Sequence, residues 1–183
     1  MVGMWTRILT GATLAFVAAG GWTAGAKDPC GDSALVSQAY PWYEATVLEV
    51  LDPITLLVNV QRVPGIASLT GCEAGPCKVR LVNLVSPADA ALASAARLSL
   101  SDRCKSKKVS LSISPHQRDG AYVNAIVRLG EFMLNETQIE SGFATYHRQA
   151  PYAVDWYVEC RLQRAESLAQ KARRGVWRAG SPK

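Results

Sequence analysis

The segment 47–60, VLEVLDPITLLVNV, constrains the fold more than any other part of the chain. Its two halves are rich in β-branched and apolar residues, and Asp52-Pro53 between them is a turn signal, so the segment predicts a β-hairpin. The pattern extends to Glu44 before the turn and to Val63 after it. A hairpin alone is only marginally stable in water, so the sequence predicts a larger sheet around this one.

Three further segments have the pattern of strands, and three have the pattern of helices. We expect strands at 78–85, 109–115 and 121–129. We expect a helix at 88–104, with Ser86 as its N-cap and Asp89 in its first turn. A short helix at 135–141 should end at Gly142, and a long one at 152–174 should stop at Gly175. This order predicts an α+β fold, a small closed five-stranded β-barrel with helices packed outside it.

The first 26 residues have the composition of a secretory signal peptide. Arg7 precedes the apolar or small residues 8–19, and Ala24-Gly25-Ala26 has the pattern of a cleavage site. The apolar run is shorter than the roughly 20 residues that a membrane span needs. We therefore expect an exported protein, periplasmic or secreted, without a transmembrane segment in the mature chain. Its parts should be a lead-in, one folded domain and a short tail, at 27–44, 45–178 and 179–183.

All five cysteines follow the expected cleavage site, and export would place them where disulfides persist. Five cysteines cannot all pair within one chain, and their spacing does not select one connectivity. The nearest local pair joins Cys72 to Cys77, and the candidate second pair joins Cys104 to Cys160. A zinc site is the competing interpretation, and the lack of a histidine close in sequence argues against it.

Four segments share their pattern with a known family: VLEVLDPIT, VRLVNLVSP, GEFMLNETQIESGFA and AESLAQKARRGVW. Together with the order of the expected elements, they resemble the staphylococcal nuclease (thermonuclease-like) family from about Ala45 to Trp177. The last segment, which ends in Gly175-Val176-Trp177, is the most specific. The resemblance implies an OB-fold barrel with three helices, and active members of this family cleave DNA or RNA phosphodiester bonds with calcium.

The family's metal site is the first place where this sequence departs from the pattern. A hard divalent cation needs oxygen ligands, chiefly carboxylates. In the family the hairpin turn reads Asp-Gly-Asp-Thr, and its second aspartate binds the metal. The resemblance places Ile54 at that position and Pro53 at the glycine, whereas Asp52 and Thr55 match.

The family's remaining catalytic groups fall on two later strands. A carboxylate must activate water, and two guanidinium groups should grip the phosphate. The resemblance places Arg80 at the first arginine, Val85 at a second metal ligand and Ala88 at the catalytic glutamate. The second arginine falls on Ala121, or on Tyr122 if the match shifts by one residue. Four of the five catalytic positions therefore lack their functional group.

Three carboxylates lie close to these positions and offer a shifted site: Asp52, Asp89 and Asp119. We expect Asp52 to serve as a turn residue and Asp89 to serve in the first turn of a helix. Asp119 lies in the turn that should carry the lost arginine.

The candidate ligand-binding residues are Arg80, Thr55, Tyr122 and Tyr146. Arg80 either still holds a phosphate or another anion, or pairs with a carboxylate of the barrel. The aromatic residues either bind strands or sugars on the barrel, or pack in the core. Asn135 stands in an Asn-Glu-Thr glycosylation sequon, but we expect it to form internal hydrogen bonds at a helix start.

These substitutions predict a domain that has lost nuclease activity and serves as a binding or assembly module, without a cofactor. The signal peptide predicts that this domain is exported. Its partner would be nucleic acid, another anionic polymer or an envelope protein, and the formal net charge of +5 tolerates an anionic partner without demanding one. Two alternatives stay open. One is an active nuclease that uses calcium through displaced carboxylates, and the other is a purely structural envelope protein.

Overall fold

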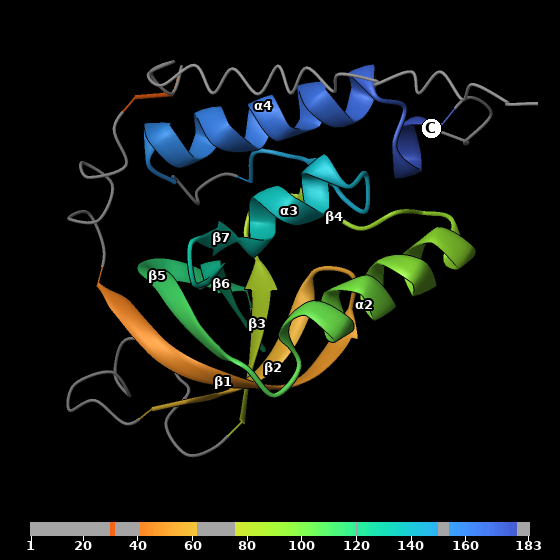
Figure 1. The fold of residues 1–183 in the computed structure, drawn as a ribbon. Helices are drawn as coiled ribbons and strands as arrows, with labels where there is room; N and C mark the ends of the chain where they lie inside the picture. The colour runs from red at the N-terminus through yellow and green to blue at the C-terminus, as the bar shows by residue number, and fades with distance from the viewer. Residues whose placement is uncertain (1–29, 32–40, 62–75, 120, 150–153, 179–183) are drawn as a thin grey trace, which may run out of the picture.

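The structure is a computed structural model that describes residues 30–31, 41–61, 76–119, 121–149 and 154–178, without the side chains of 114–119. Its strands and helices follow one another along the chain as shown in Figure 1. In order they are β1 (Trp42–Asp52), β2 (Thr55–Val60), β3 (Pro76–Leu81), β4 (Leu84–Val85), α2 (Ala90–Cys104), β5 (Lys108–Asp119), β6 (Tyr122–Leu129), β7 (Phe132–Met133), α3 (Leu134–Glu140), β8 (Thr145–Tyr146), α4 (Trp156–Lys171) and the 3₁₀ turn η2 (Gly175–Trp177).

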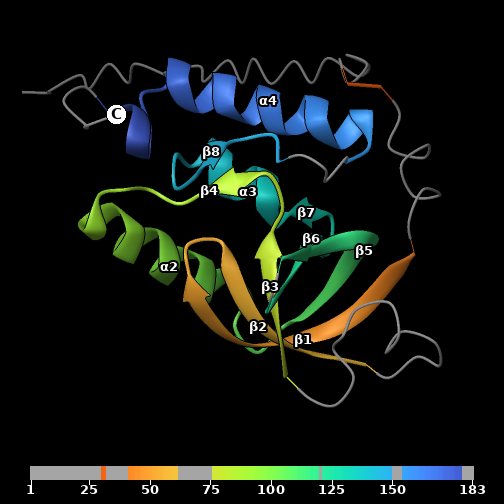
Figure 2. The ribbon, with the colours of Figure 1, turned by 180° about the vertical axis from the view of Figure 1, so that it is seen from behind.

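The barrel closes through one parallel contact. β3, β2, β1, β5 and β6 are antiparallel neighbours in this order, and β6 returns to pair with β3 in parallel. In Figures 1 and 2, α2 lies beside the barrel, and α3 lies between the barrel and α4. The described residues form a closed five-stranded mixed barrel with three α-helices, so the prediction of an α+β OB-fold is confirmed.

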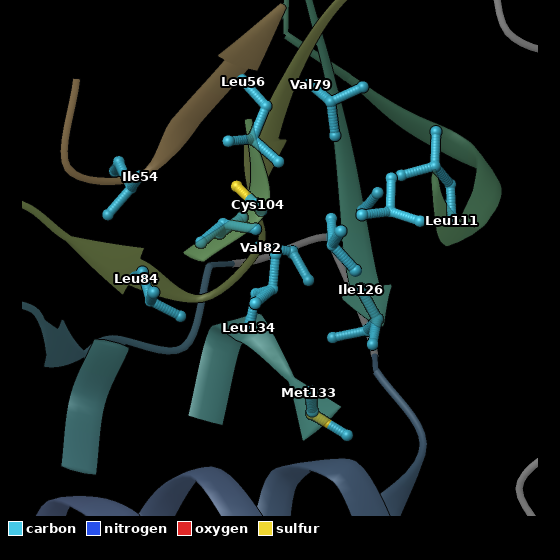
Figure 3. Close-up of a cluster of buried hydrophobic side chains, with 14 of the residues drawn as sticks. Ile54, Leu56, Val79, Val82, Leu84, Cys104, Leu111, Ile126, Met133 and Leu134 are labelled. Carbon is cyan, nitrogen blue, oxygen red and sulfur yellow. The ribbon is translucent and has the colours of Figure 1, made fainter. Parts of the chain in front are cut away.

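The core fills the barrel with the alternate apolar side chains of its strands. On β1, Tyr43, Ala45 and Val47 are buried, and the alternation breaks at exposed Leu48 and Glu49, where the pairing with β2 shifts its register. Such a β-bulge turns two consecutive side chains away from the regular pattern. Figure 3 shows part of the core, including Ile54, Leu56, Val79, Leu84 and Leu134. The period-2 pattern in the sequence therefore marks the inward face of the strands.

The two long helices begin at aspartates. The side chain of Asp89 accepts a hydrogen bond from the amide of Leu92 (2.7 Å), and that of Asp155 accepts one from Tyr157 (2.8 Å). The prediction of Ser86 as an N-cap is wrong, because Ser86-Pro87 still belongs to the connection before the helix, which begins at Ala90. An aspartate at the N-cap satisfies a free amide and also favours the positive end of the helix dipole.

The ends of α4 differ from the predicted 152–174. The helix starts at Trp156, and the predicted start at Tyr152 lies outside the described residues. It ends at Lys171, because Arg173 takes a left-handed backbone with φ +50° and no α-helix continues through that conformation. Gly175 then opens the 3₁₀ turn η2. Within the described residues, no helix is long and apolar enough to cross a bilayer.

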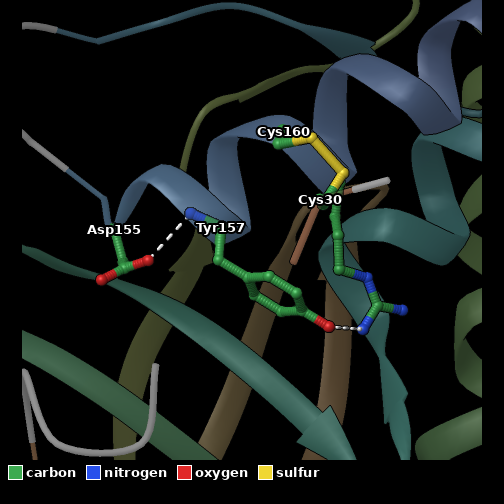
Figure 4. Close-up of a disulfide and its surroundings, with 5 residues drawn as sticks. Cys30, Asp155, Tyr157 and Cys160 are labelled. Atoms are coloured by element: carbon green, nitrogen blue, oxygen red, sulfur yellow. Dashed lines mark hydrogen bonds between the residues drawn. A yellow bond between two sulfur atoms is a disulfide. The ribbon is translucent and has the colours of Figure 1, made fainter. Parts of the chain in front are cut away.

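The disulfide pairing differs from the prediction. Cys160 on α4 is bonded to Cys30, 130 positions earlier (Figure 4). Cys104, in contrast, is a free, buried thiol at the end of α2. The predicted pair of Cys104 with Cys160 is therefore wrong. Burial raises the pKa of the Cys104 thiol to about 11, and its Sγ donates to the carbonyl of Leu100. Cys77 is also disulfide-bonded, and its predicted partner Cys72 lies outside the described residues.

Asn135 ties the start of α3 to two strands. Its Oδ1 accepts from the amide of Val127 (2.9 Å), and its Nδ2 donates to the carbonyls of Val82 and Ala125 (3.2 Å each). The side chain is fully buried. The expectation of internal hydrogen bonds is confirmed, and in this fold the amide of the sequon is not accessible to a glycosylating enzyme.

Replacing Asn135 should weaken the fold strongly. Asn135→Ala leaves one amide and two carbonyls of the barrel without their side-chain partner, so we expect the free energy of unfolding to fall by about 3 kcal/mol. Thr137→Ala is the matched control, because it also removes the sequon but loses only a local bond to the carbonyl of Met133. Urea unfolding followed by circular dichroism measures both. Equal losses in the two variants would contradict the role given to Asn135.

Candidate functional site

The bend between β1 and β2 is held from three sides. Asp52 accepts from the amide of Ile54 (2.8 Å), the carbonyl of Ile54 accepts from the amide of Leu81 (2.8 Å), and Gln138 of α3 donates to the carbonyl of Pro53 (2.6 Å). The side chain of Ile54 is only 8% exposed and packs with the core (Figure 3). The bend is therefore a rigid, apolar corner, and Asp52 has the turn role expected from the sequence.

Arg80 lies on the outward side of β3, next to an aromatic ring. Along this strand Val79 and Leu81 are buried and point inward, whereas Lys78 is exposed and Arg80 is half-buried. The guanidinium carbon of Arg80 lies 4.1 Å from the centre of the Tyr122 ring, and the Lys78 ammonium lies 5.8 Å from it. Two cations thus gather at one aromatic side chain, an arrangement that the negative face of the ring favours.

Two buried polar side chains flank Arg80 in the sheet. Thr55 of β2 is the direct partner of Arg80 on one side, and Asn124 of β6 is its partner on the other. Directly paired residues point to the same face of a sheet. Thr55 and Asn124 are each 1% exposed, and Thr55 Oγ1 and Asn124 Oδ1 have no hydrogen-bond partner among the described residues.

The site residues predicted from the sequence did not include Lys78 or Asn124. The signal for Lys78 was its position two residues before Arg80 on a strand, which places both side chains on one face. The signal for Asn124 was a polar residue inside the apolar run of β6, YVNAIVRL. Neither signal identifies a site by itself, because only the pairing of β3 with β6 brings Asn124 beside Arg80.

Val85, Ala88 and Asp89 lie along the connection from β3 to α2. The side chain of Val85 is 43% exposed, and Ala88 and Asp89 are exposed as well. Asp89 is engaged as the N-cap of α2. This stretch therefore presents an apolar surface and one carboxylate, which already caps α2.

Tyr146 is engaged with α4. Its hydroxyl donates to Glu159 (2.8 Å), and its amide donates to Glu166 (2.9 Å). Burial and the hydrogen bond to Glu159 raise the pKa of the Tyr146 hydroxyl. On the β4–β8 ribbon it pairs with Leu84, next to Val85. These contacts indicate that Tyr146 fixes the β4–β8 ribbon on α4.

The family to which the chain belongs follows from residues 78–179, which match the family described as staphylococcal nuclease homologue. These residues are more than half of the chain and run from β3 through η2. The chain belongs to the staphylococcal nuclease homologue family. No curated protein matches the chain.

The resemblance implies a calcium site, and the structure shows whether side-chain oxygens are placed to bind calcium there. Ile54 and Val85 offer no oxygen from their side chains, and Asp52 and Asp89 each accept a hydrogen bond from the local backbone. In the part of the chain that the structure describes, no three or more histidine, cysteine or acidic side chains gather in a way that would hold a metal. Calcium needs six to eight oxygen ligands, so the described residues do not fit it.

Ala121 and Tyr122 stand at the two positions where the resemblance places the second arginine. Tyr122 packs on the Arg80 guanidinium, whereas Ala121 is exposed at the turn. Asp119 is the direct backbone partner of Tyr122 across β5 and β6, and its side chain lies outside the described part. The site of this nuclease homologue is thus a cationic and aromatic surface beside an apolar corner.

Proposed function

We propose that this chain is an exported nuclease homologue that does not cleave nucleic acid by the family mechanism and serves as a binding module for an anionic ligand such as nucleic acid. One observation carries the proposal. The position at which the resemblance places a metal-binding aspartate is Ile54, whose side chain packs in the core. Its amide donates to the Asp52 side chain, and its carbonyl accepts from the amide of Leu81.

The chemistry of the remaining side chains supports binding without cleavage. Hydrolysis needs a group that activates water and donors that stabilise charge in the transition state, and loss of one such donor alone costs about 3 kcal/mol of barrier. Ala88 and Val85 supply neither. Lys78 and Arg80, in contrast, keep positive charge beside Tyr122, and such charge attracts phosphate without any catalytic group.

The expected result is binding without turnover. The disulfide-containing protein should bind labelled single-stranded oligonucleotides and should release no cleavage product with calcium, with magnesium or manganese, or with chelator. Contacts from two cations predict that affinity falls about sevenfold when salt rises fourfold. Fluorescence anisotropy measures the binding, and denaturing gels of the same samples measure the cleavage.

Two arginine variants give the matched comparison. Arg80→Ala should weaken binding about tenfold, since a charged hydrogen bond to phosphate is lost. Arg128→Ala should change it less than twofold, although Arg128 also packs on an aromatic ring, that of Trp42 at 4.4 Å. Metal-dependent cleavage that disappears in Arg80→Ala would overturn the proposal and point to displaced carboxylates. A rise of the melting temperature on addition of calcium would also count against the proposal, since a ligand that binds the native state must stabilise it.

A further inference from the structure

Helix α2 is apolar on the side that faces away from the barrel. Its buried residues, Ala96, Leu100 and Cys104, lie on one side of the helix, and α2 packs with that side on β1. A surface helix normally carries charged and polar residues opposite its core side. Between Ala90 and Leu100, however, Arg97 is the only charged residue of the sequence. Both sides of α2 therefore have the composition of a buried surface.

The outward side of α2 is nevertheless exposed. Ala91, Ala95 and Leu98 follow one another at helical spacing, opposite the core residues, and all three are exposed, Leu98 at 52%. In Figures 1 and 2, α2 lies at the edge of the molecule, with the barrel on one side of it. Helix α4 differs, because most of its exposed residues are polar, Gln163 and Lys171 among them. The outward side of α2 is thus suited to burial against another molecule.

The shape of this side is complementary to a second copy of itself. Leu98 projects from one half of it, and Ala91, Ser94 and Ala95 have short side chains that leave room in the other half. Two α2 helices can pack antiparallel about a two-fold axis that passes between the positions of Ala95 and Leu98. Each leucine then lies over the alanines of the other helix, as a knob fills a hole in a coiled coil. One two-fold contact buries both leucines, because the same surface supplies both halves.

The charges at the ends of α2 favour the antiparallel order. Asp89 lies at the N-terminal end, Arg103 and Lys105 lie at the C-terminal end, and all three are exposed. Antiparallel pairing brings the aspartate of each copy near the two cations of the other, whereas parallel pairing would bring like charges together. Asp102 also lies on the outward side, and antiparallel pairing brings it to the N-terminal turn of the other helix, where the dipole favours a carboxylate.

We infer that two copies of this chain associate through α2, with the two helices antiparallel and Leu98 of each copy packed on the alanines of the other. Contacts between single helices lie at the small end of specific interfaces, so the dissociation constant should be on the order of 10 µM. The inference does not depend on the proposed function, because α2 contains neither Lys78 nor Arg80.

The oligomeric state in solution tests this inference. Sedimentation velocity of the disulfide-containing protein should show a monomer–dimer equilibrium with a dissociation constant of this order. Leu98→Glu should raise the dissociation constant about tenfold, because an unpaired carboxylate would be buried against the second copy. Ala95→Lys should act in the same way. Leu168→Glu is the matched control, since Leu168 is 42% exposed but lies on α4, and it should change the dissociation constant less than about twofold.

Three outcomes would overturn the inference. A protein that stays monomeric at about 1 mM, far above the expected dissociation constant, has no such interface. A dimer that both α2 variants leave intact uses another surface, and equal weakening by Leu168→Glu would show the same. Circular dichroism checks that each variant is folded, which we expect because all three substituted side chains are exposed.

Cross-linking tests the antiparallel order of the helices. Antiparallel pairing places residue 91 of one copy beside residue 102 of the other, and it keeps the two copies of residue 91 about 16 Å apart along the helix axis. A short thiol cross-linker should therefore join a mixture of the Ala91→Cys and Asp102→Cys variants, and should join neither variant alone. The unsubstituted protein gives the background from the native cysteines. Cross-linking within each variant alone would overturn the antiparallel pairing.

Discussion

Gly175→Ala should lower the free energy of unfolding by about 4 kcal/mol, from left-handed strain together with steric overlap. Gly175 has φ +48°, and a methyl group at its Cα would overlap the carbonyl oxygen of Gly142. That oxygen accepts a hydrogen bond from the amide of Val176 (2.9 Å), which joins η2 to the end of α3. The side chain of alanine would force this junction apart. Urea unfolding monitored by tryptophan fluorescence measures the loss.

Gly130→Ala separates the two causes. Gly130 also has a positive φ, +58°, but a methyl group there would have no atom within 4 Å. It should therefore cost about 1 kcal/mol, the part that comes from the left-handed backbone alone. A loss at Gly175 no larger than the loss at Gly130 would show that the junction of Gly142 with Gly175 does not stabilise the fold.

Removal of the Cys30–Cys160 disulfide should also have a large effect. The bond closes a loop over a sequence separation of 130 residues. In the chain-entropy model a loop of this order lets a disulfide stabilise the fold by about 5 kcal/mol. The double variant Cys30→Ser/Cys160→Ser should lose about this much free energy of unfolding, because its unfolded chain gains freedom that the bond removes.

Cys104 provides the control for the disulfide. Cys104→Ala removes a buried thiol but no disulfide, so it should cost about 1 kcal/mol. Peptide mapping of the oxidised protein should recover Cys30 linked to Cys160, and Cys104 should resist alkylation until the protein unfolds, because burial raises its pKa. A Cys104–Cys160 peptide, or equal losses in the two variants, would show the pairing in the structure to be incorrect.

The strands of the barrel and its first hairpin were predictable from local patterns. Alternation along β1 and β3 marks which side chains are buried, and the Asp52-Pro53 signal marks the hairpin turn. The expectation that Asn135 bonds internally also held, since its position at a predicted helix start limits what its side chain can do. The strand alternation and the hairpin turn depend on neighbours within a few residues.

The site was only partly predictable. The sequence identified Arg80 and the apolar residues Ile54 and Val85, because a motif can be matched from the order of residues alone. It did not identify Asn124 or Lys78 as companions of Arg80, and it paired Cys160 with the wrong cysteine. Asn124 and Arg80 lie on different strands, and Cys30 and Cys160 are 130 positions apart.

The sequence by itself determined which segments become strands and helices and which catalytic positions lack a functional group. Only the tertiary structure decided that Tyr122 stacks on Arg80 and that Cys30 reaches Cys160. It also decided that Thr55 Oγ1 and Asn124 Oδ1 are buried on both sides of Arg80 without a hydrogen-bond partner among the described residues. The physical reason is that strand periodicity and helix caps act between near neighbours in the chain. Barrel closure instead brings together distant residues, at distances that no local pattern encodes.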